Sequence, residues 1–376
     1  MFQDEVDKVE TPAIEQLQKL GWRYVPGVEL SPEGSTGERA FYRDVVLTGS
    51  LESALRRLNP WLSDENLRKV MREFTHPNHA GLMEYNHSLY SLLVNYLSVD
   101  QDLGKGRKGQ TVRVIDFETP ENNDFLCTSQ FKVAGPVQNI IPDIVCFVNG
   151  LPLAVLECKS PYITDPMAEG VDQLRRYANL RYPESEEGAP RLFWYNQFMV
   201  ALSRDHARVG TISASASHYA EWKDAYPYTD ADIQALRQAP QPWERKDAQE
   251  APSQAYLANA REIAGQAESA GSVAPQERLL AGMFNRGSFL DLIQNFIVYE
   301  PIEGRLIKKV ARYQQYRAVN RVIDRLRNGS DRKEKSGVVW HTQGSGKSLT
   351  MVMLAMKMRR DPELQQYKMV FVTDRS

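Results

Sequence analysis

Residues 141–159, IPDIVCFVNGLPLAVLECK, combine two apolar runs with charged side chains that stand only at their outer ends. Asp143 precedes the first run, whereas Glu157 and Lys159 follow the second. Carboxylate oxygens from Asp143 and Glu157, with the backbone carbonyl between Glu157 and Lys159, are ligands that suit Mg²⁺. A bound Mg²⁺ ion acidifies a water molecule and offsets charge on a scissile phosphate. The pattern therefore predicts a metal-dependent nuclease site, with Lys159 orienting the water or stabilising the transition state.

The register of the two runs decides whether the carboxylates can meet. The Asn-Gly pair at 149–150 predicts a β-hairpin, and a strict two-residue turn there places Asp143 opposite Leu156, on the wrong face for Glu157. An odd-length loop or a bulge brings Asp143 opposite Glu157, and Pro152 favours an irregular start to the second strand. We therefore expect a departure from a regular two-residue turn. The same charges also fit a simpler interpretation, in which they cap the ends of buried strands.

A helical pattern follows this hairpin, from residue 166 to residue 181. Within it, Gln173 and Tyr177 stand at i and i+4 in DQLRRYAN and so share one face of the helix. Beside a phosphodiester they could orient a DNA backbone oxygen or the attacking water. Taken alone, the pair also fits an ordinary surface helix.

A glycine-rich segment near the C-terminus predicts a phosphate-binding loop. VVW at 338–340 and KMVFVT at 368–373 are expected to be strands, and HTQGSGKS and LTMVMLAMKM between them a loop and a helix. Gly344 and Gly346 let backbone N–H groups approach a phosphate, and the helix adds its positive N-terminal end. Lys347 can reach the outer phosphates of a nucleotide, and the Ser348 hydroxyl can bind Mg²⁺. A chance glycine-rich turn is the alternative.

The elements that position these residues fall into two predicted units. We expect a first domain over 1–240, a linker or helical connector rich in Ala, Gln, Pro and Ser over 241–278, and a second unit over 279–376. In the first, 12–20 is an expected helix, 111–159 is rich in strands, and RLFWYNQFMVALS is an expected pair of buried strands.

Composition limits the class of protein without naming it. The chain has 376 residues, 42% hydrophobic and 25% charged, with a net charge of −2, as expected of a globular protein without a global positive field. Residues 301–337 carry eleven Lys and Arg against four Asp and Glu, which fits either a DNA or nucleotide surface or a solvated helix face. We expect no membrane span and no signal peptide. Three cysteines without zinc spacing fit reduced, buried thiols, and we expect a cytoplasmic protein.

The chain resembles the restriction (motor) subunit of type I restriction-modification enzymes. The resemblance runs through LGWRYVPG, ALRRLNP, DFETPENNDF, PDIVCFVNGLPLAVLECK, QLRRY, ARYQQYRAVN and WHTQGSGKS and covers nearly the whole chain. It implies an α/β fold, in which a PD-(D/E)xK endonuclease domain with a mixed sheet flanked by helices precedes the start of a RecA-like superfamily 2 translocase domain. His341 stands at the first glycine of GxxxxGK[ST], a variant that suits motor ATPases, and Thr342 stands where their loop often has Ala.

The resemblance also implies roles for individual residues. The nuclease residues would be Asp143, Glu157, Lys159, Gln173 and Tyr177, of which Asp143 and Glu157 would hold Mg²⁺. The ATP-binding residues would be Gln315, Thr342, Gln343, Gly344, Ser345, Gly346, Lys347 and Ser348, of which Ser348 would also bind Mg²⁺. Gln314 competes with Gln315 for the adenine-proximal role. A glutamate on the first helix assists the metal in some relatives, and Glu10 fits this role best while Glu15 remains open.

The function implied is Mg²⁺-dependent cleavage of double-stranded DNA coupled to ATP-driven translocation, with methyltransferase and specificity subunits as partners that supply recognition. A stand-alone repair helicase-nuclease and a catalytically silent docking module are the alternatives. The sequence downstream would separate the first from the second, and a Mg²⁺-dependent nicking assay bears on the third. Because the motor residues that position water and stabilise the transition state are not found up to Ser376, we expect this chain to bind ATP weakly without turnover.

Overall fold

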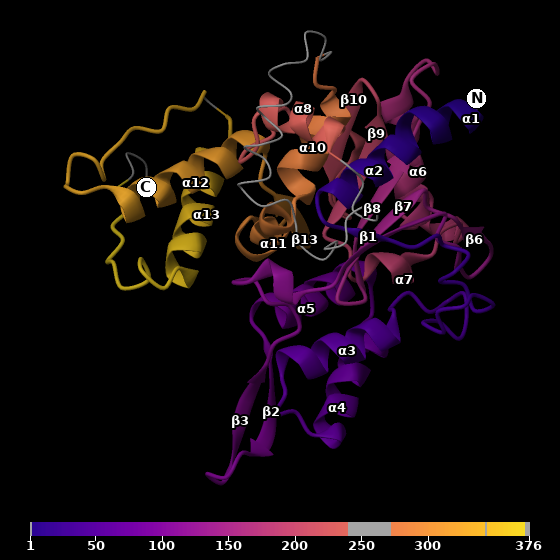
Figure 1. The fold of residues 1–376 in the computed structure, drawn as a ribbon, viewed down its shortest axis with the longest axis horizontal. Coiled ribbons are helices and arrows are strands. Elements are labelled where there is room, and N and C mark those ends of the chain that lie inside the picture. Colours follow the sequence, from indigo (N-terminus) through magenta and orange to yellow (C-terminus); the bar gives the residue numbers. More distant parts are fainter. Residues whose placement is uncertain (1, 240–271, 343, 373–376) are drawn as a thin grey trace.

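The protein is an α/β structure built around one mixed sheet, seen here in a computed structural model that describes residues 2–239, 272–342 and 344–372 (Figure 1). The seven strands of this sheet are β1 (Arg23–Tyr24), β4 (Phe125–Ser129), β7 (Ile144–Val148), β8 (Leu151–Cys158), β9 (Phe198–Ser203), β10 (His206–Gly210) and β11 (Ala220–Glu221). In space they follow the order β1-β4-β7-β8-β9-β10-β11. The expected mixed sheet with helices is confirmed.

The middle of the sheet is entirely buried. β8 pairs in parallel with β9 and antiparallel with β7, and every residue of these three strands is buried. Strands buried on both faces are continuous apolar runs, which is what IVCFV, LPLAVLEC and FMVALS show. The free thiols of Cys127, Cys146 and Cys158 all lie in this buried region, as expected.

Helices surround the sheet and extend away from it. They are α1 (Phe2–Glu5), a π-helical turn (Val6–Glu10), α2 (Thr11–Lys19), α3 (Thr48–Leu58), α4 (Asp64–Thr75), α5 (Leu82–Val94), α6 (Pro166–Tyr177), α7 (Pro190–Phe193), α8 (Asp230–Gln238), α10 (Pro275–Phe284), α11 (Arg286–Asn295), α12 (Tyr313–Asn328) and α13 (Lys347–Arg360). α6 packs closely on β8 and β9 because it has a glycine at the contact: a Cβ added to Gly170 would lie 3.2 Å from the Ala201 Cβ.

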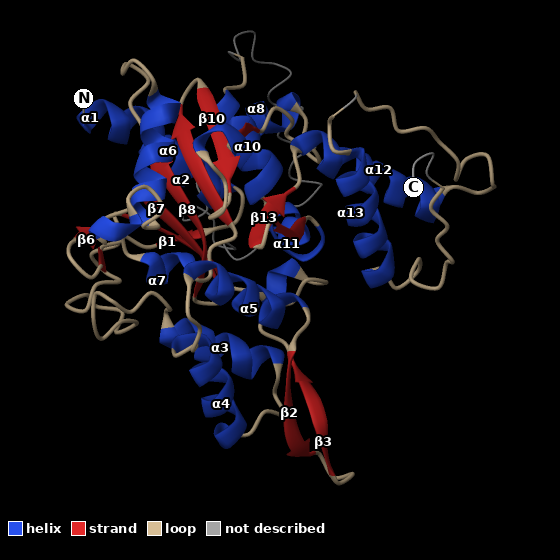
Figure 2. Ribbon diagram, turned by 180° about the vertical axis from the view of Figure 1, so that it is seen from behind, coloured by secondary structure: helices blue, strands red, loops and turns tan. Residues whose placement is uncertain are grey.

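Smaller sheets and short turns complete the fold. The paired strands are β2 (Leu97–Asp102) with β3 (Arg107–Val112), β5 (Val133–Ala134) with β6 (Asn139–Ile140), and β12 (Ile297–Ile302) with β13 (Arg305–Val310). The 3₁₀ turns are Pro120–Asn122, Pro183–Ser185 and Ala216–His218. Figure 2 shows the β2–β3 ribbon projecting from the body of the molecule beside α3 and α4.

α10 and α11 pack directly against the N-terminal part of the chain. The Trp22 ring stands edge-on to the rings of Phe125 and Phe289, with centroids 5.0 and 5.1 Å apart, and its Nε1 donates to the Phe284 carbonyl at 2.6 Å. Aromatic contacts of this kind add to the stability that burial itself provides. The boundary predicted near residue 279 stays a prediction, and most of the expected 241–278 linker lies outside the described residues.

Three strand predictions were wrong. The segments 338–340 and 368–372 are loops, with Val338 and Trp340 91% and 83% exposed, because neither segment has a hydrogen-bonded strand beside it and an unpaired strand is unstable in water. The expected strand pair at 191–203 is instead α7 followed by β9. No helix in the described parts of the chain is both long and apolar enough to cross a membrane.

Candidate active site

The β7–β8 hairpin brings Asp143 opposite Glu157 by means of a bulge. The turn itself is regular, since Asn149 and Gly150 have φ of 50° and 79° and Val148 pairs with Leu151. The departure expected in the turn itself is therefore wrong, whereas the bulge that the sequence offered as the alternative, at the start of the second strand near Pro152, is confirmed.

The register shifts further along the hairpin. Phe147 pairs with Pro152 but Cys146 pairs with Ala154, so Leu153 is the extra residue of a β-bulge. Beyond this bulge Ile144 pairs with Leu156, and the same register places Asp143 against Glu157. The predicted facing of the two acidic residues is confirmed.

Asn149 anchors this turn through its side chain. Its Nδ2 donates to the Val114 carbonyl and to Asn123 Oδ1, both at 2.8 Å, and its Oδ1 accepts from the Asp124 N–H at 2.8 Å. Asn tolerates the left-handed conformation that the turn requires. The segment DFETPENNDF thus holds the hairpin that carries the candidate site.

Glu157, Lys159 and Asp143 form a compact buried cluster. Lys159 Nζ donates to Glu157 Oε1 at 2.8 Å and to the Cys158 carbonyl at 3.0 Å, while the Cys158 N–H donates to Asp143 Oδ2 at 2.7 Å. Glu157 is fully buried, and Asp143 and Lys159 are 7% and 5% exposed. The sequence-predicted nuclease residues therefore meet at one end of the sheet.

Burial and mutual repulsion shape the charges of this cluster. Burial raises the pKa of Glu157 well above its usual value, and the neighbouring Asp143 carboxyl raises it further. Burial likewise raises the pKa of Asp143. For Lys159 burial acts to lower the pKa, but the carboxyl groups of Glu157, Asp143 and Glu5 outweigh it and the pKa is raised. Lys159 is therefore a stable cation, and its single positive charge faces two carboxyl groups.

The residues present fit a hard divalent cation. Glu157 Oε2 is buried and has no hydrogen-bond partner among the described residues, which is costly unless a cation or a proton satisfies it. The Cys158 carbonyl provides a third oxygen next to the carboxylates. Within the described ranges, no group of three or more His, Cys, Asp or Glu side chains is placed to hold a metal ion. A cation here would be held by the two carboxylates and the Cys158 carbonyl.

A π-helical turn brings two N-terminal glutamates to this cluster. The Thr11 N–H donates to the Val6 carbonyl, which is the i to i+5 bond of a π-helix. Glu5 Oε2 lies 3.9 Å from Lys159 Nζ, and Glu10 Oε2 accepts from Gln130 Nε2 at 3.1 Å. Burial and the Asp143 charge raise the pKa of Glu10 to about 7.

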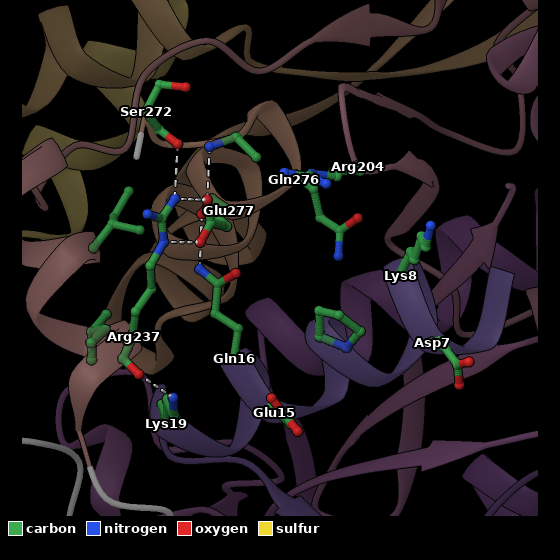
Figure 3. Close-up of a pocket in the computed structure, with 14 residues that line it drawn as sticks. Asp7, Lys8, Glu15, Gln16, Lys19, Arg204, Arg237, Ser272, Gln276 and Glu277 are labelled. Carbon is green, nitrogen blue, oxygen red and sulfur yellow. Dashed lines mark hydrogen bonds and ion pairs between the residues drawn. The ribbon is translucent and has the colours of Figure 1, made fainter. Parts of the chain in front are cut away.

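Glu15 lies away from this cluster. It lines a cavity of about 680 Å³ together with Lys19 and Glu277, at the part of the cavity away from Lys8 and Arg204 (Figure 3). Of the two glutamates that the sequence left open, only Glu10 is thus beside the carboxylate pair. The sequence analysis missed Glu5. Glu5 stands five residues before Glu10, and this spacing puts both side chains on one side only because residues 6–10 form a π-helical turn.

Gln173 and Tyr177 are hydrogen-bonded to each other and to the backbone that precedes Asp143. Gln173 Nε2 donates to the Tyr177 hydroxyl at 2.6 Å, and that hydroxyl donates to the Ile141 carbonyl at 3.1 Å. Tyr177 is buried, and its pKa is raised by burial and then by the Glu157 charge. The pair fixes the segment 141–143 and lies near the carboxyl cluster.

The glycine-rich loop has part of its expected geometry. Gly344 and Gly346 adopt φ of 75° and 84°, and α13 begins at Lys347, so the predicted helix is confirmed. Gln315 Nε2 donates to the Gly346 carbonyl at 3.1 Å. Gln314 instead lines a cavity between α12 and the segment 337–341.

The remaining loop residues are open to solvent or bonded locally. Thr342, Lys347 and Ser348 are exposed, and Ser345 Oγ donates to the Thr342 carbonyl at 2.6 Å. Gln343 lies outside the described residues. The structure thus selects Gln315 over Gln314 as the residue in contact with the loop.

The fold and the site together define an α/β protein with a buried carboxylate pair and lysine at the ends of two neighbouring strands. The family model for the N terminus of the type I restriction enzyme R protein matches residues 2–218, and the SWI2/SNF2 ATPase model matches residues 314–376. The chain belongs to the family of type I restriction enzyme R proteins.

Curated relatives agree with this assignment. The chain is 30% identical to the type I restriction enzyme HindI endonuclease subunit of Haemophilus influenzae, over 98% of this chain and 31% of the relative. It is 27% identical to the putative type I restriction enzyme MjaIXP endonuclease subunit of Methanocaldococcus jannaschii, over 98% of this chain and 32% of the relative. The chain spans about a third of the length of these relatives.

Proposed function

We propose that this chain carries the PD-(D/E)xK nuclease site of a type I restriction subunit, followed by the start of its RecA-like superfamily 2 motor. The observation that carries the proposal is the bulge at Leu153, which turns Asp143 toward Glu157 and Lys159 at the end of buried strands. A hairpin in regular register would separate these side chains onto opposite faces. The register shift lies within a buried strand pair. This supports an active site here, since β-bulges are frequent next to active sites.

The chemistry assigned to this site is hydrolysis of a DNA phosphodiester. The Asp143 and Glu157 carboxylates and the Cys158 carbonyl would hold Mg²⁺, which when bound acidifies water and offsets charge on the phosphate. Lys159 stays protonated and directs its ammonium group at Glu157, from where it can donate to a phosphate oxygen or to the attacking water. Tyr177 and Gln173 keep the Asp143 backbone in place. The buried strands around these groups exclude bulk water, which strengthens the electrostatic interactions that the groups make.

The glycine-rich loop is proposed to bind ATP. Gly344 and Gly346 have positive φ, a conformation that glycine adopts readily, and the N-terminal end of α13 favours an anion. The exposed Lys347 and Ser348 side chains are free to reach phosphate and Mg²⁺. The proposal also includes ATP-driven translocation on double-stranded DNA. It includes methyltransferase and specificity subunits as partners, and a cytoplasmic location.

The test uses the complete subunit assembled with its partner subunits. We expect Lys159→Ala to abolish DNA cleavage and to leave DNA-stimulated ATP hydrolysis intact, because Lys159 and Lys347 belong to different sites. Lys347→Ala should remove ATP hydrolysis and, because cleavage is coupled to translocation, DNA cleavage as well. Lys105→Ala, at the exposed turn between β2 and β3, is the matched control and should change neither activity. Retained cleavage by the Lys159→Ala enzyme would overturn the nuclease assignment.

A further inference from the structure

Three side chains outside the carboxyl cluster surround the end of the sheet that carries it. They are Lys8 on the π-helical turn, Tyr162 in the loop that follows Lys159, and Arg204 immediately after β9. None of them belongs to the predicted nuclease or ATP residues. Each can reach a molecule from solvent, since Tyr162 is 68% exposed and Arg204 and Lys8 are also open. We call this set the rim.

Lys8 and Tyr162 are held together beside the site. Lys8 Nζ donates to the Tyr162 hydroxyl at 2.5 Å and lies 4.5 Å from the centre of its ring. The hydroxyl raises the pKa of Lys8, which therefore stays cationic. Lys8 follows Glu5 by one turn of the N-terminal helix, and Glu5 faces Lys159. The same helix thus directs carboxylates at the cluster and an ammonium group at the rim.

Arg204 reaches the same edge of the sheet through strand order. β8 and β9 run in parallel, so their C-terminal ends lie side by side, and the Lys159 N–H donates to the Leu202 carbonyl at 2.8 Å. Arg204 follows Leu202 by two residues. It has no ion-pair or hydrogen-bond partner among the described residues, and its charge acts on Lys8.

Lys8 and Arg204 both line one cavity. Figure 3 shows Lys8 extending toward the end of the cavity at which Arg204 stands, whereas Asp7 points away from it. Three cations of the cavity have partners: Arg237 pairs with Glu277, Lys19 donates to the Arg237 carbonyl at 3.0 Å, and Lys8 Nζ lies 3.8 Å from Asp4 Oδ1. The Arg204 charge acts against that of Lys8 despite the nearby Asp4, so an anion between the two cations is favoured.

We propose that the rim of Lys8, Tyr162 and Arg204 holds the phosphate backbone of double-stranded DNA next to the scissile bond. The inference rests on the nuclease function proposed above and adds a binding surface to it. Lys and Arg bind a phosphate by charge, and a tyrosine hydroxyl adds a donor. The rim contacts no base, so it positions any DNA sequence equally, as expected where recognition belongs to another subunit.

The test measures DNA binding by the 376-residue chain. A short fluorescent duplex of arbitrary sequence is titrated by anisotropy in Ca²⁺, at several salt concentrations. Arg204→Ala and Lys8→Ala should each weaken binding about fivefold, and each should lower the slope of log K against log salt by about 1. Arg204→Lys should restore most of the affinity, because it restores the charge. The loss should be the same for unrelated duplex sequences.

The control is Arg68→Ala, an exposed arginine on α4, which lies far from α1 in Figure 1. The DNA-binding role of the rim would be overturned if Arg204→Ala and Lys8→Ala left the affinity and the salt slope unchanged. An equal loss of affinity for Arg68→Ala would overturn it too. Lys159-dependent cleavage in the assembled enzyme would in that case leave the nuclease proposal standing. If the unsubstituted chain binds no duplex and cleavage does not depend on Lys159, both proposals fail.

Discussion

Gln130 holds Asp143 by both its backbone and its side chain. The Gln130 N–H donates to the Asp143 carbonyl at 2.9 Å, and Gln130 Nε2 donates to Asp143 Oδ1 at 3.3 Å and to Glu10 Oε2 at 3.1 Å. Gln130 adopts φ of 52°, a left-handed conformation that is uncommon for a residue other than glycine. Strained backbone of this kind concentrates at functional sites. No sequence motif singled out this residue.

We predict that Gln130→Ala lowers the rate of DNA cleavage without reducing DNA binding. The side-chain amide fixes the orientation of two carboxyl groups, and loss of such an outer partner of a metal site costs about 10- to 100-fold in activity. Single-turnover cleavage by the assembled enzyme measures the effect. Gln138→Ala is the matched control, since the Gln138 side chain donates to the Glu187 carbonyl on the surface. Equal rates for the two variants would contradict the role given to Gln130.

The Asn149 side chain should contribute strongly to stability. Asn149→Ala removes four side-chain hydrogen bonds, three of them at 2.8 Å, and places a less tolerant residue at φ of 50°. We expect a loss of about 3 kcal/mol in the free energy of unfolding, measured by urea denaturation. Asn149→Gly keeps the backbone freedom but loses the hydrogen bonds, so it should recover only part of this loss. Full recovery in the glycine variant would show that the hydrogen bonds contribute little.

The pKa of Glu10 predicts that the metal-free protein loses stability as pH rises. The pKa is about 7 in the folded chain, above the usual value of 4.5, so the folded state keeps its proton longer than the unfolded state does. Between about pH 4.5 and pH 7 the free energy of unfolding should therefore fall, by about 2 kcal/mol after allowance for solvent screening. Glu157 and Asp143, whose pKa values are also raised, act in the same direction.

Denaturation in EDTA across this pH range measures the effect. Glu10→Gln should flatten the pH dependence, whereas Glu15→Gln, on the same N-terminal helical segment but away from the cluster, should leave it unchanged. Added Mg²⁺ should restore stability at high pH, since a ligand that binds only the folded state stabilises it. Identical pH curves for the two variants would contradict the coupling of Glu10 to the cluster.

The local elements around the site could be predicted from the sequence because short-range chemistry specifies them. Asn-Gly between apolar runs specifies the hairpin, and the pattern at 166–181 specifies α6, with Gln173 and Tyr177 bonded to each other. The acidic residues and Lys159 could be recognised because charged side chains are rarely buried unless they are paired. The strands expected at 338–340 and 368–373 were wrong for the converse reason: a strand is completed by a neighbour, which sequence periodicity does not supply.

Tertiary structure decided which residues share the site. The bulge at Leu153 sets the register that joins Asp143 to Glu157, and its position depends on packing within a fully buried sheet. The choice of Glu10 over Glu15 depends on how a π-helical turn meets β8, and Gln130 reaches the site only through a left-handed backbone. The sequence by itself determined the reactive groups and their strands, because these follow from residue type and spacing. Their convergence was decided by contacts between segments far apart in the chain, which no local pattern encodes.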